Sequence, residues 1–169
     1  MKRTQLEIRD IRIYERLKAE SGVTAHVKNI AGHPSKLSSL SIATDDEKCI
    51  IDDYIGLAAS ECLMTINHYL SPCNISEEND SNDTQYKVRH FSMTIPDTFS
   101  EGEITQIGNI IMDFICNRCL QQWYILVKSD DANISAIKAQ SSMALLREIL
   151  AMHGNRKKIR RRATDIAGI

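Results

Sequence analysis

The chain has 169 residues, 43% of them hydrophobic and 25% charged, with a formal net charge of −1. This length and composition are typical of one globular domain that buries roughly two-thirds of its unfolded surface. No apolar run approaches the roughly 20 residues that span a membrane, and the charged start at residues 1–7 lacks the apolar segment of a secretory signal. We therefore expect no membrane contact, and a protein that stays in the compartment where it is made.

Residues 4–20 predict a helix, because Leu6, Ile13, Tyr14 and Leu17 share one helical face. The alternation of apolar residues within the first half of this segment also leaves a strand open.

Ser21 and Gly22 predict the end of that first helix. Residues 22–43 show no clear periodicity, so we expect a loop there. His26 and His33 fall in this segment without an evident partner, and solvated histidines are the expected outcome.

Residues 44–69 predict a second helix. Thr44 and Glu47 have the spacing of a capping box, in which each side chain bonds the other's backbone. Apolar residues then recur at helical spacing: Ile50, Ile51, Tyr54, Ile55, Ala58, Cys62, Ile66 and Tyr69. Pro72 ends the helix, and the acidic residues 71–85 predict a solvated loop without the spacing of a calcium loop.

Residues 86–95 are the best strand candidate in the sequence. Apolar side chains lie first at even-numbered positions such as Val88 and then at odd-numbered positions such as Phe91, so we expect a bulge or a change of strand partner near His90. A single strand is unstable alone. Its partner is expected in residues 23–43 or in another subunit.

Two further helices follow. Ser100 and Glu103 form a second capping box, and the helix after it is apolar around most of its circumference, which indicates a central position that includes Trp123. Residues 129–131 cap the last helix, which is predicted to run to about Met152. Its predicted buried face holds Ile134, Ile137, Ala144, Leu145 and Ile149.

The five cysteines are Cys49, Cys62, Cys73, Cys116 and Cys119. An odd number without regular spacing argues against a disulfide framework. The last two form a C-x-x-C pair that resembles half of a zinc site, but the sequence has no second pair to complete four ligands. We therefore expect buried, inert thiols and no metal or other cofactor.

The C-terminal segment carries the densest charge. Six of seven residues are basic in the run Arg156, Lys157, Lys158, Ile159, Arg160, Arg161 and Arg162. Since the whole chain is −1, everything outside this run sums to −7. Such a run is often only a solvated end, it can neutralise nucleic-acid phosphates, and its guanidinium groups suit an acidic groove on a protein.

Together these elements predict a mainly α protein, a bundle of about four helices with a small β element. We expect one helical domain at 1–155, with loops at 22–43 and 71–85, and a basic arm at 156–169. An enzyme is not expected, because the sequence lacks a phosphate loop, a serine elbow, a metal-binding histidine pair and any other convergent catalytic motif.

The layout of the second half resembles the head–tail connector (adaptor) proteins of tailed bacteriophages and prophages. The resemblance is strongest over residues 86–162, is weaker over 44–69 and is absent from 22–43. It rests on these features: a strand opened by Tyr86 and ended by Pro96, the turn Asp97-Thr98-Phe99, a hydrophobic helix with Trp123-Tyr124, an alanine-bearing last helix and the basic tail.

This resemblance implies a ring, commonly of twelve copies, seated under the portal protein. The arm Arg156–Arg162 would reach into the portal, and the body would receive the next neck or tail protein. The protein would then occupy the host cytoplasm during assembly and later the neck of the virion. The alternative is a small DNA-binding or regulatory helical protein, although the basic cluster follows the last helix and does not lie on it.

Overall fold

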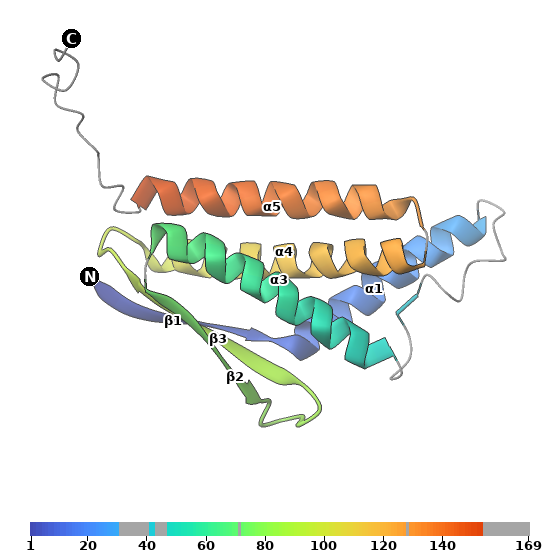
Figure 1. The fold of residues 1–169 in the computed structure, drawn as a ribbon, viewed down its shortest axis with the longest axis horizontal. Coiled ribbons are helices and arrows are strands. Elements are labelled where there is room, and N and C mark those ends of the chain that lie inside the picture. The colour runs from blue at the N-terminus through green and yellow to red at the C-terminus, as the bar shows by residue number, and fades with distance from the viewer. Residues whose placement is uncertain (31–40, 43–46, 71, 128, 154–169) are drawn as a thin grey trace, which may run out of the picture.

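The computed structural model describes residues 1–30, 41–42, 47–70, 72–127 and 129–153. Within these ranges the chain forms four helices and three strands (Figure 1). They follow in the order β1 (Lys2–Arg9), α1 (Asp10–Ile30), α3 (Lys48–Tyr69), β2 (Cys73–Asn79), β3 (Lys87–Ile95), α4 (Glu101–Leu126) and α5 (Asp131–His153). The predicted fold class, mainly α with a small β element, is confirmed.

Helix α4 occupies the centre and packs against α1, α3, α5 and β1. Figure 1 shows α5 lying along one side of α4 and the sheet on the opposite side. This position follows from the sequence of α4, which is apolar around most of its circumference and is buried along its length. Trp123 is only 4% exposed, which confirms its predicted burial.

The three strands form one antiparallel sheet in the order β1-β3-β2. The prediction of β3 at residues 86–95 is confirmed, but its expected partner in 23–43 is wrong: β1 and β2 pair with it on either side. The register runs without interruption past His90, so the predicted bulge is also wrong. The Arg89 side chain is buried on the same face of β3 as Phe91 and Met93. Because this buried position holds a charged residue, the apolar alternation in the sequence is interrupted there.

The predicted helix over residues 4–20 is correct only in its second half. Residues 2–9 form β1, because pairing with β3 satisfies their backbone groups and buries Leu6 and Ile8 on one face. The helix then runs from Asp10 through the predicted stop at Ser21. The Ser21 hydroxyl is buried and accepts a hydrogen bond from the backbone N–H of Ile42 at 3.1 Å, so the serine joins two segments.

Two predicted loops are partly wrong. Residues 22–30 continue α1, whereas the rest of the 22–43 segment lies outside the described residues except for 41–42. Within 71–85, residues 73–79 form β2 on the edge of the sheet. Its acidic side chains face basic side chains of β3: Glu77 pairs with Lys87 at 3.0 Å, and Glu78 lies 2.8 Å from His90.

The predicted start of the second helix at Thr44 lies outside the described residues, and α3 is described from Lys48. The capping box of α4 is confirmed. The Ser100 hydroxyl accepts from the N–H of Glu103 at 3.2 Å, and the Glu103 carboxylate accepts from the N–H of Ser100 at 2.8 Å.

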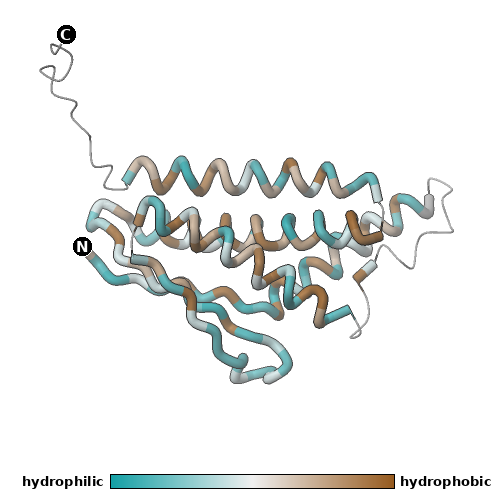
Figure 2. Tube along the Cα trace, in the orientation of Figure 1, coloured by the Kyte–Doolittle hydropathy of each residue, from teal (hydrophilic) through white to brown (hydrophobic). Residues whose placement is uncertain are grey.

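The predicted buried face of α5 is wrong except at Ile149, which is buried. Ile134 and Ile137 are 56% and 64% exposed, and Leu145 is also exposed. The helix instead packs through Ser135, Ala139, Met143, Leu146, Ile149 and Leu150. Figure 2 shows hydrophobic and hydrophilic residues alternating along the whole of α5, so hydropathy does not single out one face.

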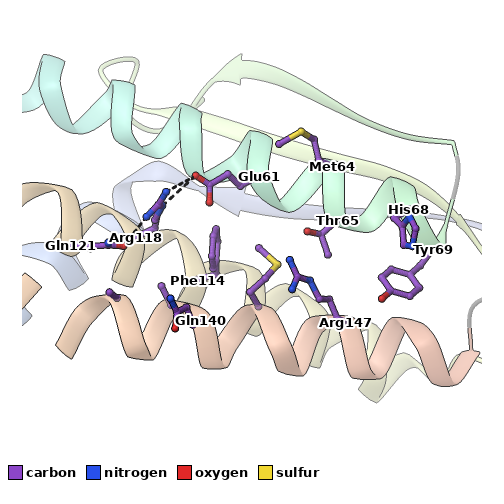
Figure 3. A pocket seen from close by; sticks show the side chains of 13 residues that line it. Glu61, Met64, Thr65, His68, Tyr69, Phe114, Arg118, Gln121, Gln140 and Arg147 are labelled. Carbon is purple, nitrogen blue, oxygen red and sulfur yellow. Dashed lines mark hydrogen bonds and ion pairs between the residues drawn. The ribbon is translucent and has the colours of Figure 1, made fainter. Parts of the chain in front are cut away.

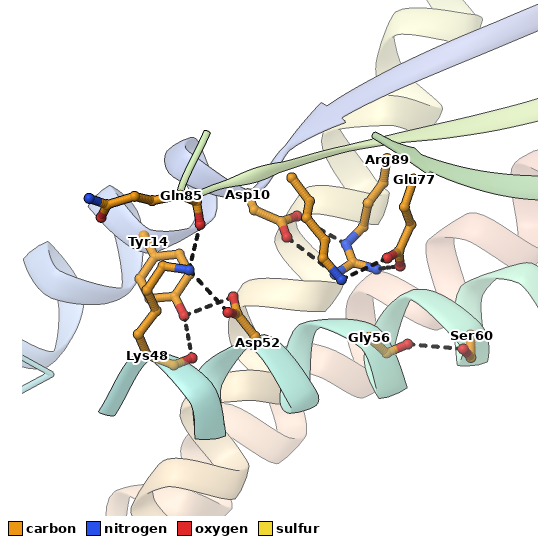
Figure 4. A network of polar contacts seen from close by, with 10 residues as sticks. Asp10, Tyr14, Lys48, Asp52, Gly56, Ser60, Glu77, Gln85 and Arg89 are labelled. Atoms are coloured by element: carbon orange, nitrogen blue, oxygen red, sulfur yellow. Dashed lines mark hydrogen bonds and ion pairs between the residues drawn. The ribbon is translucent and has the colours of Figure 1, made fainter. Parts of the chain in front are cut away.

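A buried ion pair fastens the sheet to α1 (Figure 4). Arg89 on β3 donates to both carboxylate oxygens of Asp10 at 3.0 and 3.2 Å and also pairs with Glu77 on β2. Asp10 is 1% and Arg89 2% exposed. Burial raises the pKa of Asp10, and the Arg89 guanidinium opposes that shift.

A neighbouring network joins α1 to the start of α3. The Tyr14 hydroxyl donates to the Lys48 carbonyl at 2.7 Å and lies 3.1 Å from Asp52, and the Lys48 ammonium donates to the Gln85 carbonyl at 2.6 Å (Figure 4). The two networks fix how α1, α3 and the sheet lie relative to one another.

Candidate functional site

Within the described ranges, no group of three His, Cys, Asp or Glu side chains is placed to hold a metal ion. Cys116 and Cys119 are buried in α4. Burial raises the pKa of Cys116 to about 12 and raises that of Cys119 well above its usual value, so both remain protonated thiols at neutral pH. No helix in the described part of the chain is long and apolar enough to cross a membrane.

Replacing Cys116 and Cys119 together by alanine should lower the free energy of unfolding by about 1–3 kcal/mol, because two buried sulfur atoms lose their packing. Urea denaturation measures this loss. Alanine at Cys49, an exposed thiol, is the control and should change stability little. Stoichiometric zinc in the purified protein, found by elemental analysis, would contradict the structural role of the pair.

The predicted partner-binding residues Arg156–Arg162 lie outside the described residues. The structure does show how the preceding helix ends. His153, at the end of α5, stacks on Phe99 with ring centroids 4.5 Å apart and lies 2.7 Å from the Glu103 carboxylate. The Ser100 backbone N–H, the Ser100 hydroxyl and His153 all lower the pKa of Glu103. The end of α5 is therefore anchored to the capping box of α4.

A groove of about 770 Å³ runs between α3 and α5, with α4 as its floor (Figure 3). Phe114 of α4 and Met143 of α5 supply its apolar base, and Met64 of α3 stands at its rim, 68% exposed. Methionine side chains adapt to irregular partners, which suits a surface that receives another polypeptide segment.

Charged side chains line the same groove. Arg118 donates to Glu61 across the groove floor at 3.0 and 3.2 Å and to Gln121 at 2.8 Å (Figure 3). Arg147 of α5 also lines the groove and is exposed. An apolar base bordered by arginines can bind an amphipathic segment of a partner.

The outer face of α3 continues this surface. Ile50, Leu57 and Met64 follow at seven-residue intervals and are 39%, 64% and 68% exposed. Seven residues are close to two helical turns, so the three side chains form a line, here called the α3 stripe. Scattered apolar residues are normal on a surface, whereas an aligned set whose last member, Met64, lines a groove is a candidate interaction site.

A second groove of about 540 Å³ lies between α1 and α5. Val23 and Ile134 line it from the two helices, and Asn117 of α4 lies at its base. The Asn117 amide donates to the Asp113 carbonyl at 2.8 Å, while its own oxygen is buried without a hydrogen-bond partner among the described residues. Figure 1 shows α5 lying above α4. One of the two grooves borders α5 on the side of α3, and the other borders it on the side of α1.

Sequence reasoning placed the functional surface in the basic arm and missed the helix faces. The seven-residue spacing of the α3 stripe is visible in the sequence, but Ile50 was grouped with neighbours that are buried, such as Ile51 and Ile55. The segment has more apolar residues than a single buried helix face can hold. This excess is the signal in the sequence that predicts a second, exposed apolar face on α3.

Comparison of this chain with protein families, curated proteins and solved structures finds no match in any of the three.

Proposed function

We propose that this protein is a structural subunit that works by docking to other protein subunits. The observation that carries the proposal is the α3 stripe: three large apolar side chains, aligned on an outer helix face beside an open groove. Burying such side chains against a partner is favourable by about 25 cal/mol per Å² of apolar surface.

Within this class, the layout of residues 86–162 favours a head–tail connector subunit of a tailed phage or prophage. The protein would form a homo-oligomeric ring, twelve-fold in the commonest arrangement, between the portal and the next neck or tail protein. Ring subunits joined head to tail need two different contact faces, and the α3 stripe offers one of them. The site of action would be the host cytoplasm during assembly and then the neck of the virion.

The arm would supply the portal contact. His153, the last described residue before it, stacks on Phe99 and pairs with Glu103, so the described end of α5 is anchored to the start of α4. Several arginine–carboxylate pairs in a partly desolvated groove reinforce one another more than isolated surface pairs, which contribute about 0–1 kcal/mol each. The apolar Ile159 within the run suits a protein groove with one hydrophobic notch.

Truncation after Asn155 should abolish attachment to the portal while leaving the helical circular dichroism spectrum unchanged, because the arm lies beyond α5. Truncation after Arg162 retains the arm and is the matched control; it should bind the portal like the full chain. Binding is measured at physiological salt, since charge pairs weaken as salt rises.

The same two truncations distinguish the second candidate, a DNA-binding protein, which the six positive charges of the arm favour. Gel shift with duplex DNA should show no sequence-specific complex for any of the three chains. Full-affinity portal attachment by the chain that ends at Asn155 would show that the arm is not the docking element. Specific DNA binding that the same truncation removes would favour the second candidate.

A further inference from the structure

Six exposed residues on the outer face of α5 follow one another at alternating steps of four and three: Ile134, Lys138, Ser141, Leu145, Glu148 and Met152. This is the spacing of a helix seam, in which every member points toward the same neighbouring helix. We call this set the α5 seam. Its apolar members, Ile134, Leu145 and Met152, are 41% to 67% exposed. When a helix packs against a partner helix, most residues at such positions are buried.

The two charges in the α5 seam have opposite signs and lie in its two halves. Lys138 and Glu148 are each five residues from Met143, on either side of it. Neither forms an ion pair with another residue in the part of the chain that the structure describes. As far as the described residues go, both charges can therefore face a partner from another molecule.

The seam is complementary to itself in one orientation. If two copies of α5 cross antiparallel about Met143, Lys138 of each copy faces Glu148 of the other. Ile134 then faces Met152, because each lies nine residues from Met143. A parallel pair would instead place lysine against lysine and glutamate against glutamate, which disfavours that arrangement.

We propose that α5 binds α5 of a second copy of this chain, antiparallel, through the α5 seam. The contact is two-fold symmetric, so each pairing occurs twice. Ile137, 64% exposed, and Ala144 flank the seam and add apolar surface to the contact. The groove between α1 and α5 opens beside Ile134 and is lined by Val23, which gives Met152 of the other copy an apolar place to enter.

This contact goes beyond the connector proposal, in which the arm makes the portal contact and the α3 stripe contributes a contact between ring subunits. A two-fold pair through α5 leaves the α3 stripe free for those contacts. The two ideas can therefore fail separately, and the experiment keeps them apart.

The test is sedimentation equilibrium of the full chain with charge reversals in the seam. In the absence of a portal, on which the ring would assemble, the wild-type chain should form dimers. Lys138→Glu or Glu148→Lys alone places like charges together twice and should weaken self-association at least about tenfold. The double variant K138E/E148K should associate like the wild type, since the pairs are only exchanged. An equimolar mixture of the two single variants should also form dimers, because one copy carries two lysines and the other two glutamates.

These side chains are exposed, so the variants should keep the wild-type melting temperature. The variant Leu57→Lys, in the α3 stripe, should leave the dimer unchanged. A wild-type chain that stays monomeric, single reversals without effect, or a double variant as weak as the single ones would each overturn the antiparallel pairing. If only Leu57→Lys dissociates the oligomer, the self-contact uses α3: the α5 proposal is then wrong, and the connector proposal stands.

Discussion

Replacing Arg89 by methionine should lower the free energy of unfolding by about 3–5 kcal/mol, a large share of the 5–15 kcal/mol typical of a domain. The guanidinium is 2% exposed and holds Asp10, which is 1% exposed, through two hydrogen bonds. Methionine fills most of the volume, so the loss comes from leaving the Asp10 carboxylate buried without its charge partner.

Urea denaturation at neutral pH measures this loss. The matched control is Arg9→Met on the neighbouring strand β1, whose arginine pairs with Glu7 at 2.6 Å at the surface, where a pair of this kind contributes little. The double variant D10N/R89M should recover part of the stability, because it removes the unpaired buried charge. An R89M variant no less stable than R9M would show that the buried pair is not required.

The same variant should depend on pH in a defined direction. Burial already raises the pKa of Asp10, and without Arg89 nothing opposes that rise. A carboxyl with a raised folded-state pKa binds its proton more tightly in the folded chain, so it destabilises the fold above that pKa. The destabilisation of R89M relative to wild type should therefore shrink as the pH falls and the buried carboxyl becomes protonated.

Replacing Trp123 by alanine should cost roughly 3–5 kcal/mol, because it removes the largest side chain from the centre of the bundle. Trp123 is 4% exposed on α4, the helix that contacts α1, α3 and α5, and neighbouring layers cannot close a cavity of that size without moving. Thermal unfolding at equal protein concentrations measures the effect.

Ile125→Ala is the control for Trp123, since Ile125 lies two residues further along α4 and is 53% exposed. Its melting temperature should stay within a few degrees of the wild type. A near-wild-type melting temperature for Trp123→Ala would show that this part of α4 is peripheral to the core.

Local patterns in the sequence determined the elements whose signals do not depend on distant residues. The capping box at Ser100 and Glu103 predicted where α4 begins, and the structure contains both of its reciprocal hydrogen bonds. The apolar alternation ending at Pro96 predicted β3, and the broad apolar surface of α4 predicted the burial of Trp123. The mainly α class follows from these elements together.

Only the tertiary structure decided the elements whose local signals were balanced. Residues 2–9 suit either a helix or a strand, and pairing with β3, 79 to 93 residues away, selects the strand because it satisfies the backbone and buries Leu6 and Ile8. Arg89 belongs to the buried phase of β3 only because Asp10 and Glu77 meet it from other elements.

The candidate docking surface could not be predicted for the same reason. Helix α5 has apolar residues on two faces, and the face with Ala139 and Leu146 is buried against α4, leaving Ile134 and Ile137 exposed. The sequence by itself determined that α5 is a helix and that it is amphipathic. Which face is inside depends on the shape of the neighbouring helix, and that information is carried by residues far away in the chain.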